Sequence, residues 1–545
     1  MTGILFAVLP AVSLGAETVL EAGCPSVTEL TVGSRLNAGG LVLSLPGFWD
    51  AERITLRLGN AESFCVGPER TEIRAGEETD LRPYIGQTVY LYRTSGKTVG
   101  KLTIHRGSAI PALFLTVDSK QLGRIHQSKE REITEGRAVY IEADGTIAYD
   151  GAITQMKGRG QNTFGYPKKP YQIKLEKKAS LSGMSAAKTW VLLANWNDIS
   201  LTRNQIMLDI CRSAGLRYTP ACVPADVWIN GKYNGLYLIT EKIQIKKERV
   251  NIRDLEAEQE KVNAEAPASF PRFKTATEKL ALARGHKVAV NPEDITGGYI
   301  ATVEKHGRLR DYKESGFRTR NGLSVEIKEP TYPSREMVEY LGNLVDDMQI
   351  ALMAPDGVSP ETGKHFRDYM DGESWALKFL AEEWCKNYDF FAGSQYFYKD
   401  SDERDPLIYA GPAWDYDLSF GNMDGAGLAP DGGYVAGVQR RAPNLYWLLS
   451  HHPEFMETVG EMWRARFRPA VAVLLGEAEA AEDSVIRPLA EYTDRIRASA
   501  EMNFARWGVP KTTYGEAGGS FSRAAAYLEK WIRARTEWMD GAYGP

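Results

Sequence analysis

The chain has 545 residues, of which 43% are hydrophobic and 25% are charged, proportions typical of a folded soluble protein. This length allows a sizeable buried core and favours two domains. The net charge is −5 and the basic residues are scattered, apart from lysine pairs at 168–169 and 177–178, which disfavours a nucleic-acid partner. The 7 histidines form no H-E-x-x-H motif, which argues against a zinc hydrolase.

The 5 cysteines are too few and too scattered for a zinc ribbon or a disulfide scaffold. Cys211 and Cys222 could pair in an oxidising compartment. We favour the alternative, that they are buried free thiols, because a free cysteine behaves as a small hydrophobic residue.

Residues 4–14 form an apolar run that ends in small residues, a pattern typical of a secretory signal. We therefore expect residues 1–23 to be a leader and the protein to act outside the cytoplasm, in the periplasm, at the cell surface or after secretion. A first β-strand or a buried terminal segment is the alternative. No later stretch approaches the roughly 20 apolar residues that a membrane-spanning helix needs, so we expect no transmembrane span.

Residues 24–108 contain short strand patterns separated by Gly, Asn, Asp and Pro. The predicted strands are 41–45, 54–58, 88–92 and 99–104. Short strands at this spacing indicate a small antiparallel β-sandwich. Because this region has no cluster of catalytic residue types, we interpret it as an accessory module that could attach the chain to a cell surface.

Residues 109–545 mix strand and helix patterns, which predicts an α+β domain. Predicted strands at 112–117 and 138–141 lead to a glycine-rich turn, 158–165, between two further strands. Backbone N–H groups of such a turn can approach phosphate oxygens, and Lys174 on the returning strand can neutralise them. The alternative is a tight hairpin with exposed lysines. The turn is not a P-loop, because Tyr166-Pro167 follows Gly165 where Lys-Ser/Thr would be needed.

The remaining predicted elements follow in order. A strand at 190–194 precedes a helix at about 203–214, with Ser200 or Thr202 as N-cap and Gly215 as terminator. The next predicted elements are a hairpin of strands 225–230 and 235–241, an inserted Glu/Lys/Ala-rich segment 254–292, strands 298–303 and 323–327, helices 334–352 and 372–386, and C-terminal helices within 453–545. Four large aromatic residues of the C-terminal helices are interpreted as packing residues: Trp463, Phe467, Trp507 and Trp531.

Three carboxylates lie among aromatic residues in the stretch 372–421. The predicted helix leads into Asn387-Tyr388-Asp389, and a strand at 395–398 is followed by Trp414-Asp415-Tyr416-Asp417. Ionised carboxylates in such a setting normally hold a cation, accept a proton or pair with a base, and a divalent metal with a phosphorylated ligand would satisfy them. The order of parts is that of protein-kinase-like enzymes, although the H-R-D and D-F-G motifs are absent.

Four blocks together resemble the CotH family of spore-coat-protein-H-like atypical kinases: RGQNTFGYPKKPYQIKL at 159–175, WVLLANWND at 190–198, NGKYNGLY at 230–237 and GPAWDYD at 411–417. The resemblance covers roughly residues 110–470. It implies a two-lobed, protein-kinase-like domain with a β-rich N-lobe and a helical C-lobe, preceded here by the small all-β sandwich. It also implies transfer of the γ-phosphoryl group of ATP, with Mg²⁺ or Mn²⁺, to Ser/Thr of a surface or secreted protein.

The resemblance also implies roles for individual residues. Asp389 would orient or deprotonate the acceptor hydroxyl, and Asp415 would bind the metal that bridges the phosphates. Lys174 would contact the α- and β-phosphates, with Arg159 and the turn at Gly160 nearby.

Other assignments stay open. Asp417 would be a further metal ligand or would cap the following loop. Glu241 would lie near the adenine or pair with Lys174, and Arg203 would join the phosphate site or belong, with Asp198, to a capped helix start.

Ser394 departs from the pattern of kinases, which place an Asn metal ligand five residues after the catalytic Asp. Its hydroxyl is a weaker ligand than a carboxylate, so the activity would depend on metal in an unusual way or be lost. Two alternatives to a kinase follow: a non-catalytic surface or coat protein that uses the domain for binding, and a nucleotidyl or other phosphoryl transferase. ATP is scarce outside the cytoplasm. The prediction of kinase activity depends on a supply of ATP, whereas the prediction of the fold does not.

Overall fold

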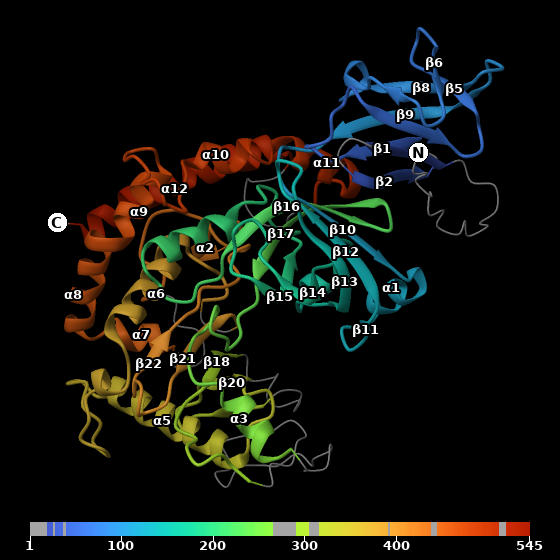
Figure 1. Ribbon diagram of the computed structural model, residues 1–545. Helices are drawn as coiled ribbons and strands as arrows, with labels where there is room; N and C mark the ends of the chain where they lie inside the picture. The colour runs from blue at the N-terminus through green and yellow to red at the C-terminus, as the bar shows by residue number, and fades with distance from the viewer. Residues whose placement is uncertain are drawn as a thin grey trace.

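The computed structural model describes residues 19–24, 28–35, 40–264, 290–304, 315–390, 393–423, 425–437, 444–511 and 519–544. The fold is α+β, as predicted: a two-sheet sandwich leads into a β-barrel, which is followed by a further sheet and a set of helices (Figure 1). Within these ranges no helix is long and apolar enough to cross a membrane.

The N-terminal sandwich consists of two sheets whose inner faces share one apolar core. One sheet contains β2 (Thr28–Arg35), β1 (Val19–Cys24), β4 (Ile54–Leu58) and β7 (Glu78–Thr79); the other contains β3 (Leu41–Leu45), β9 (Thr98–Arg106), β8 (Thr88–Arg93), β5 (Ser63–Val66) and β6 (Thr71–Arg74). The four predicted strands are present, but β3 pairs with β9 in parallel, so the second sheet is not purely antiparallel as expected.

Strand β1 includes residues 19–23, the end of the segment predicted as a leader. Its alternate residues Leu20 and Ala22 fill the sandwich core, and the strand pairs with both β2 and β4. Those residues therefore belong to the folded sandwich, whereas residues 1–18 lie outside the described part of the chain.

The central sheet closes into a barrel because its last strand, β14, also pairs with β13. Around the barrel the strands are β13 (Ile147–Gly158), β12 (Gly136–Ile141), β10 (Ala112–Val117), β16 (Cys222–Ile229), β17 (Lys232–Glu241), β15 (Ala187–Leu193) and β14 (Tyr171–Ala179), with β11 (Glu132–Ile133) added beside β13. Alternate residues point inward, as period-2 patterning requires. Ile173 and Leu175, for example, are buried in the barrel core.

The sandwich packs on the outer face of the barrel. Trp228 of β16 is fully buried there, and its ring stacks on Phe114 of β10 with centroids 5.0 Å apart. Both belong to the apolar cluster that fills the sandwich, together with Met502 of α11 (Arg497–Trp507). The two β-rich parts therefore share a continuous core.

We predict that Trp228→Ala lowers the free energy of unfolding by about 3–5 kcal/mol, because it empties the space between sandwich and barrel. Urea denaturation measures this change. Tyr90→Ala is the control: Tyr90 is 46% exposed on β8, and its loss is expected to cost no more than about 0.5 kcal/mol. Equal effects of the two substitutions would contradict a shared core.

The rest of the molecule consists of a fourth sheet and the remaining helices, of which the first, residues 119–125, lies beside the barrel strand β11 (Figure 1). The sheet order is β19 (Gly316–Arg318), β20 (Ser324–Glu329), β18 (Tyr299–Val303), β21 (Gln395–Lys399) and β22 (Ile408–Ala410), and the helices include α1 (Ser119–Ile125), α2 (Arg203–Ser213), α5 (Arg335–Met353), α6 (Gly372–Cys385), α7 (Leu445–Leu449), α8 (Pro453–Met462), α9 (Arg468–Leu474), α10 (Leu489–Asp494) and α12 (Phe521–Tyr543). Trp463, Phe467 and Trp531 are buried in the core of this region, as predicted. Trp507 is only partly buried, and its Nε1 donates to the Asn234 carbonyl at 2.9 Å.

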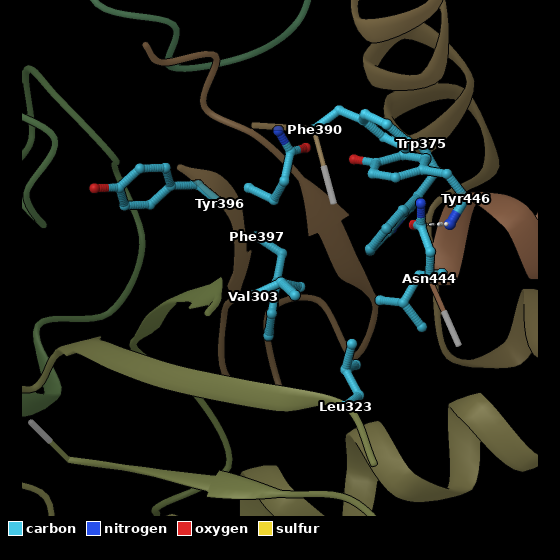
Figure 2. Close-up of a pocket in the computed structure, with 10 residues that line it drawn as sticks. Val303, Leu323, Trp375, Phe390, Tyr396, Phe397, Asn444 and Tyr446 are labelled. Atoms are coloured by element: carbon cyan, nitrogen blue, oxygen red, sulfur yellow. Dashed lines mark hydrogen bonds between the residues drawn. The ribbon is translucent and has the colours of Figure 1, made fainter. Parts of the chain in front are cut away.

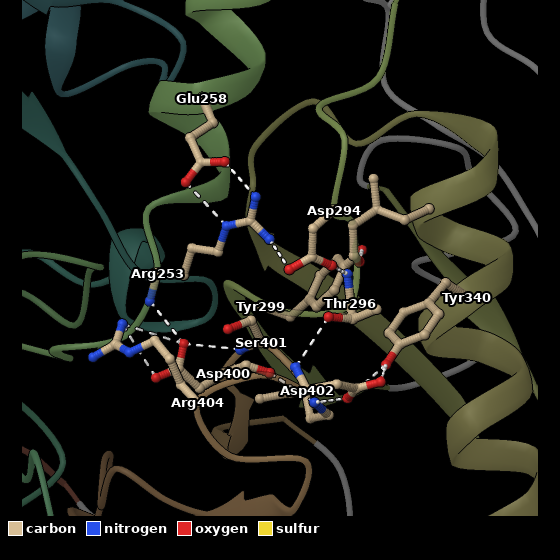
Figure 3. Close-up of polar contacts among 12 residues, drawn as sticks. Arg253, Glu258, Asp294, Thr296, Tyr299, Tyr340, Asp400, Ser401, Asp402 and Arg404 are labelled. Carbon is tan, nitrogen blue, oxygen red and sulfur yellow. Dashed lines mark hydrogen bonds and ion pairs between the residues drawn. The ribbon is translucent and has the colours of Figure 1, made fainter.

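The predicted insertion at 254–292 begins with helix α3 (Leu255–Val262), and its residues 265–289 lie outside the described residues. Figure 3 shows how its two ends are joined: the Arg253 guanidinium bonds Glu258 on one side and Asp294 on the other. The Arg253 backbone N–H also donates to Asp400 Oδ1 at 3.0 Å. These contacts fix the ends of the insertion against the loop after β21.

Candidate functional site

Two loops that carry the predicted catalytic and metal-binding carboxylates lie side by side. The N–H of Phe420 donates to the Cys385 carbonyl at 2.7 Å, and that of Tyr388 donates to the Leu418 carbonyl at 3.1 Å. Between them the fully buried Asn387 accepts the Asp389 N–H at 3.2 Å and donates to the Asp415 carbonyl at 3.4 Å. The chain thus brings Asp389 and Asp415, 26 residues apart in sequence, to one place.

Asp415 is held in an uncommon conformation. Its φ is 68° and that of Ser394 is 62°, both in the left-handed region that non-glycine residues rarely adopt. The Ser394 hydroxyl donates to Asp415 Oδ2 at 3.0 Å. Residues in strained backbone conformations are often found at functional sites.

Burial and like charge act on both carboxylates of the Trp-Asp-Tyr-Asp motif. Burial raises the pKa of Asp415, and the Ser394 hydrogen bond and the Arg159 charge oppose that rise. The pKa of Asp417 is raised well above its ordinary value by burial first and then by the charges of Asp415, Asp389 and Asp198. The arrangement therefore favours a bound cation or a proton.

Arg159 faces this acidic group. Its guanidinium lies 5.1 Å from the centroid of the Trp414 ring, and burial lowers its pKa while Tyr396 and Asp415 raise it. Within the described part of the chain its buried Nη1 has no hydrogen-bond partner. An unsatisfied buried donor beside a carboxylate cluster suits an anionic ligand.

Two further lysines, Lys157 and Lys242, lie in the same group of charges as Arg159, and neither was predicted as a site residue. The pKa of Lys242 is lowered first by burial and then by the charges of Arg159 and Lys157, whereas Glu329 raises it. Lys157 could have been found, because it lies two residues before Arg159, the spacing at which side chains of an extended chain share a face. Lys242 directly follows Glu241 and carries no distinguishing signal in the sequence.

The other predicted nucleotide-binding residues are placed differently. Lys174 is exposed on the outer face of β14. The Glu241 carboxylate pairs with Arg249 at 2.7 Å and accepts the Ala221 N–H at 3.0 Å, so its ion-pair partner is Arg249. Gly160 has a φ of 81°, and a Cβ there would lie 2.1 Å from Thr163 Oγ1, so the turn requires glycine.

Arg203 is fully buried in an ion pair with Asp198, with Nη1 and Oδ1 2.5 Å apart. Its Nε donates to the Ser419 carbonyl at 2.9 Å, and its own N–H donates to Asp198 Oδ2 at 2.9 Å. Thr202 is the N-cap residue, as predicted, but its side chain makes no capping hydrogen bond, and the first N–H of α2 is accepted by Asp198 instead. The guanidinium holds the second carboxylate loop, so the arrangement favours the capped-helix alternative for this pair.

Figure 2 shows a narrow pocket of ≈ 10 Å³ beside Phe390, room for about one water. Gln395 and Asn444 are buried in its wall, and both polar atoms of the Gln395 amide lack partners within the described ranges. Tyr396 points away from Phe397 and the pocket interior. The carboxylates are not part of its lining, so this pocket lies next to the candidate site and is separate from it.

The carboxylate loops fit a metal that is shared with a ligand. The described residues contain no group of three or more His, Cys, Asp or Glu side chains able to hold a metal ion by themselves. Mg²⁺, however, is usually bound by one or two carboxylates together with waters and substrate phosphates. Asp415 and Asp417, with the Ser394 hydroxyl beside them, supply the hard oxygen donors that Mg²⁺ and Mn²⁺ prefer.

Residues 156–539 match the family model described as CotH kinase protein, which is well over half of the chain. The chain belongs to the CotH kinase family. The resemblance found in the sequence is confirmed. The match begins at residue 156, inside the predicted range 110–470, and continues past residue 470 into α12 as far as residue 539. A search of curated proteins found no match.

Glu329, at the end of β20, gives this CotH-family chain a pH-dependent group near the cationic residues. Its Oε2 accepts the Ile245 N–H at 2.8 Å, and burial raises its pKa to about 6 from 4.5. The folded state therefore binds more protons than the unfolded state between pH 4.5 and 6. Through Glu329 the free energy of unfolding falls as pH rises across this window, and this carboxyl contributes no further change above it.

We predict that Glu329→Gln removes this fall, which amounts to at most about 2 kcal/mol. Urea denaturation at pH 4.5, 6 and 7 measures it, and Glu176→Gln on the exposed face of β14 is the control. If Glu329→Gln showed the same pH dependence as the unchanged protein, Glu329 would not be the responsible group.

Proposed function

We propose that this protein is an atypical protein kinase that transfers the γ-phosphoryl group of ATP to Ser/Thr of a surface or secreted protein. The observation that carries the proposal is the pairing of Asp389 with Asp415 through Asn387, near Arg159, whose Nη1 has no hydrogen-bond partner among the described residues. In this proposal the barrel acts as the β-rich lobe. The sheet that contains β18 to β22, together with the helices packed around it, acts as the helical lobe. Phosphoryl transfer needs mainly positioning and charge neutralisation, and these groups are suited to both.

Each residue has a defined part in the proposed reaction. Asp389 accepts the proton of the acceptor hydroxyl, and Asn387 fixes the backbone from which Asp389 projects. Asp415 and Asp417 would hold Mg²⁺ or Mn²⁺, and the metal would supply positive charge that neutralises the phosphates. On the opposite side the phosphates are bound by Arg159, Lys157 and Lys242.

Ser394 supports this function despite replacing the Asn of other kinases. Its hydroxyl donates to Asp415, so it orients the metal-binding carboxylate. A hydrogen bond to the ionised form also favours that form, as metal binding requires.

We predict that Asp389→Asn lowers phosphate transfer at least about 100-fold because it removes the proton acceptor, while metal-dependent nucleotide binding persists. Asp415→Asn is expected to lose both. The measurement is incubation of the full chain with γ-labelled ATP, Mg²⁺ or Mn²⁺ and a generic protein acceptor, beside a nucleotide-induced thermal shift.

Asp150→Asn serves as control, because Asp150 forms an exposed ion pair with Arg137 on the barrel. Full transfer by Asp389→Asn would exclude Asp389 as the proton acceptor. A nucleotide-sized mass increase of the acceptor would indicate a nucleotidyl transferase. The absence of both transfer and thermal shift would favour the non-catalytic coat or surface protein.

A further inference from the structure

The segment 428–435, a few residues after the Trp-Asp-Tyr-Asp motif, is held by buried charged side chains. Lys386 follows α6, and its Nζ donates to the carbonyls of Ala429 at 2.8 Å and Asp431 at 2.5 Å. Trp531 of α12 donates its Nε1 to the Leu428 carbonyl at 2.8 Å. Both contacts are made to the main chain, so they fix the path of the segment and not the orientation of one side chain.

Glu383 of α6 and Arg535 of α12 complete this arrangement, and both are fully buried. The two Glu383 oxygens accept the N–H groups of Tyr434 at 2.8 Å and Val435 at 2.6 Å. Arg535 donates to the carbonyls of residues 430 and 432 at 2.9 and 2.7 Å, and it forms an ion pair with Glu383 at 2.5 Å. We call Lys386, Glu383 and Arg535 the clamp.

The clamp is connected to Asp389 on both sides along the chain. Lys386 lies three residues before Asp389 and takes a left-handed φ of 48°, which ends α6. Phe390 lies directly after Asp389, and its ring centroid is 5.1 Å from that of Tyr434. Displacement of the segment would therefore move the residues on either side of Asp389.

Stability alone does not account for a buried ion pair. Replacing such a pair by well-packed apolar residues is often neutral or stabilising, so burial of Glu383 and Arg535 is weak evidence for a stabilising role. Apolar side chains, however, cannot bind backbone carbonyl and N–H groups. The clamp thus provides what an apolar core would lack, a unique position for the backbone of the segment.

We infer that Lys386, Glu383 and Arg535 are positioning residues that fix Asp389 through segment 428–435, so that the C-terminal helix α12 determines the geometry of the acceptor side of the site. The inference rests on the proposed function. It does not require covalent modification of segment 428–435, because the clamp and Trp531 make every contact to the segment that is described above. Consistent with this role, the CotH match continues into α12 as far as residue 539.

Lys386→Met tests the inference, with Lys386→Arg as the conservative variant that can still donate to two carbonyls. We expect Lys386→Met to lower kcat about 10- to 100-fold, because small displacements of catalytic groups have effects of this size. The KM for ATP is expected to stay within about twofold, since Asp415 and Arg159 are not displaced, and Lys386→Arg is expected to restore kcat.

Hydrogen exchange of peptides covering 428–437 provides a readout that does not depend on activity. Lys386→Met and Glu383→Gln are expected to speed exchange there, because each removes a contact to the segment. Arg533→Met is the control: Arg533 lies on the same helix but is exposed, pairing with Glu529 at 2.9 Å, and its loss is expected to change neither measurement.

The outcomes separate the inference from the proposed function. Faster exchange with kcat unchanged in Lys386→Met would show that the segment does not position Asp389. Unchanged exchange in both Lys386→Met and Glu383→Gln would show that the clamp does not hold the segment. If the unchanged protein transferred no phosphate to any acceptor, the proposed function would fail, and the positioning role with it.

Discussion

The buried ion pair between Asp198 and Arg203 joins the barrel to the loop that carries Asp415 and Asp417. Asp198 lies in the turn after β15, and Arg203 begins α2 and donates to the carbonyls of Ser419 and Phe420. Asn204, the next residue, accepts the Tyr416 N–H at 2.7 Å. Removing one member of such a pair leaves a buried charge uncompensated, so the turn, the helix and the carboxylate loop are energetically one unit.

The same kind of contact recurs wherever a loop of the site must be held. Asn387 fixes the main chain at Asp389 and Asp415, and the clamp fixes segment 428–435. Direct contacts to the backbone are needed here because the loops bring together carboxylates that repel one another. Burial of those carboxylates strengthens their repulsion, because surroundings of low dielectric constant screen the interaction between charges less than water does.

The opposing charges underlie the proposal that the site binds a phosphorylated ligand together with a divalent cation. The charges of Arg159 and Lys157 both act to lower the pKa of Lys242, so like charges repel one another here. An anion bound between these cations would relieve their repulsion. A cation bound at Asp415 and Asp417 would relieve the repulsion between the carboxylates. The sandwich contributes none of these groups and instead extends the core on the far side of the barrel through Trp228.

Local patterns in the sequence were sufficient to predict the main strands, helices α2, α5 and α6, the hairpin of β16 and β17, and the carboxylate motifs that identify the CotH family. These features depend on side-chain periodicity, turn residues and motif chemistry within short stretches of chain. Only the tertiary structure decided that β13 and β14 close a barrel, that Glu241 pairs with Arg249, and that Lys157 and Lys242 approach Arg159. It also decided that Arg535 reaches Glu383 across 152 residues of sequence. Such pairings are set by how distant elements pack, and a periodic pattern within one element contains no information about which charged groups another element will bring to it.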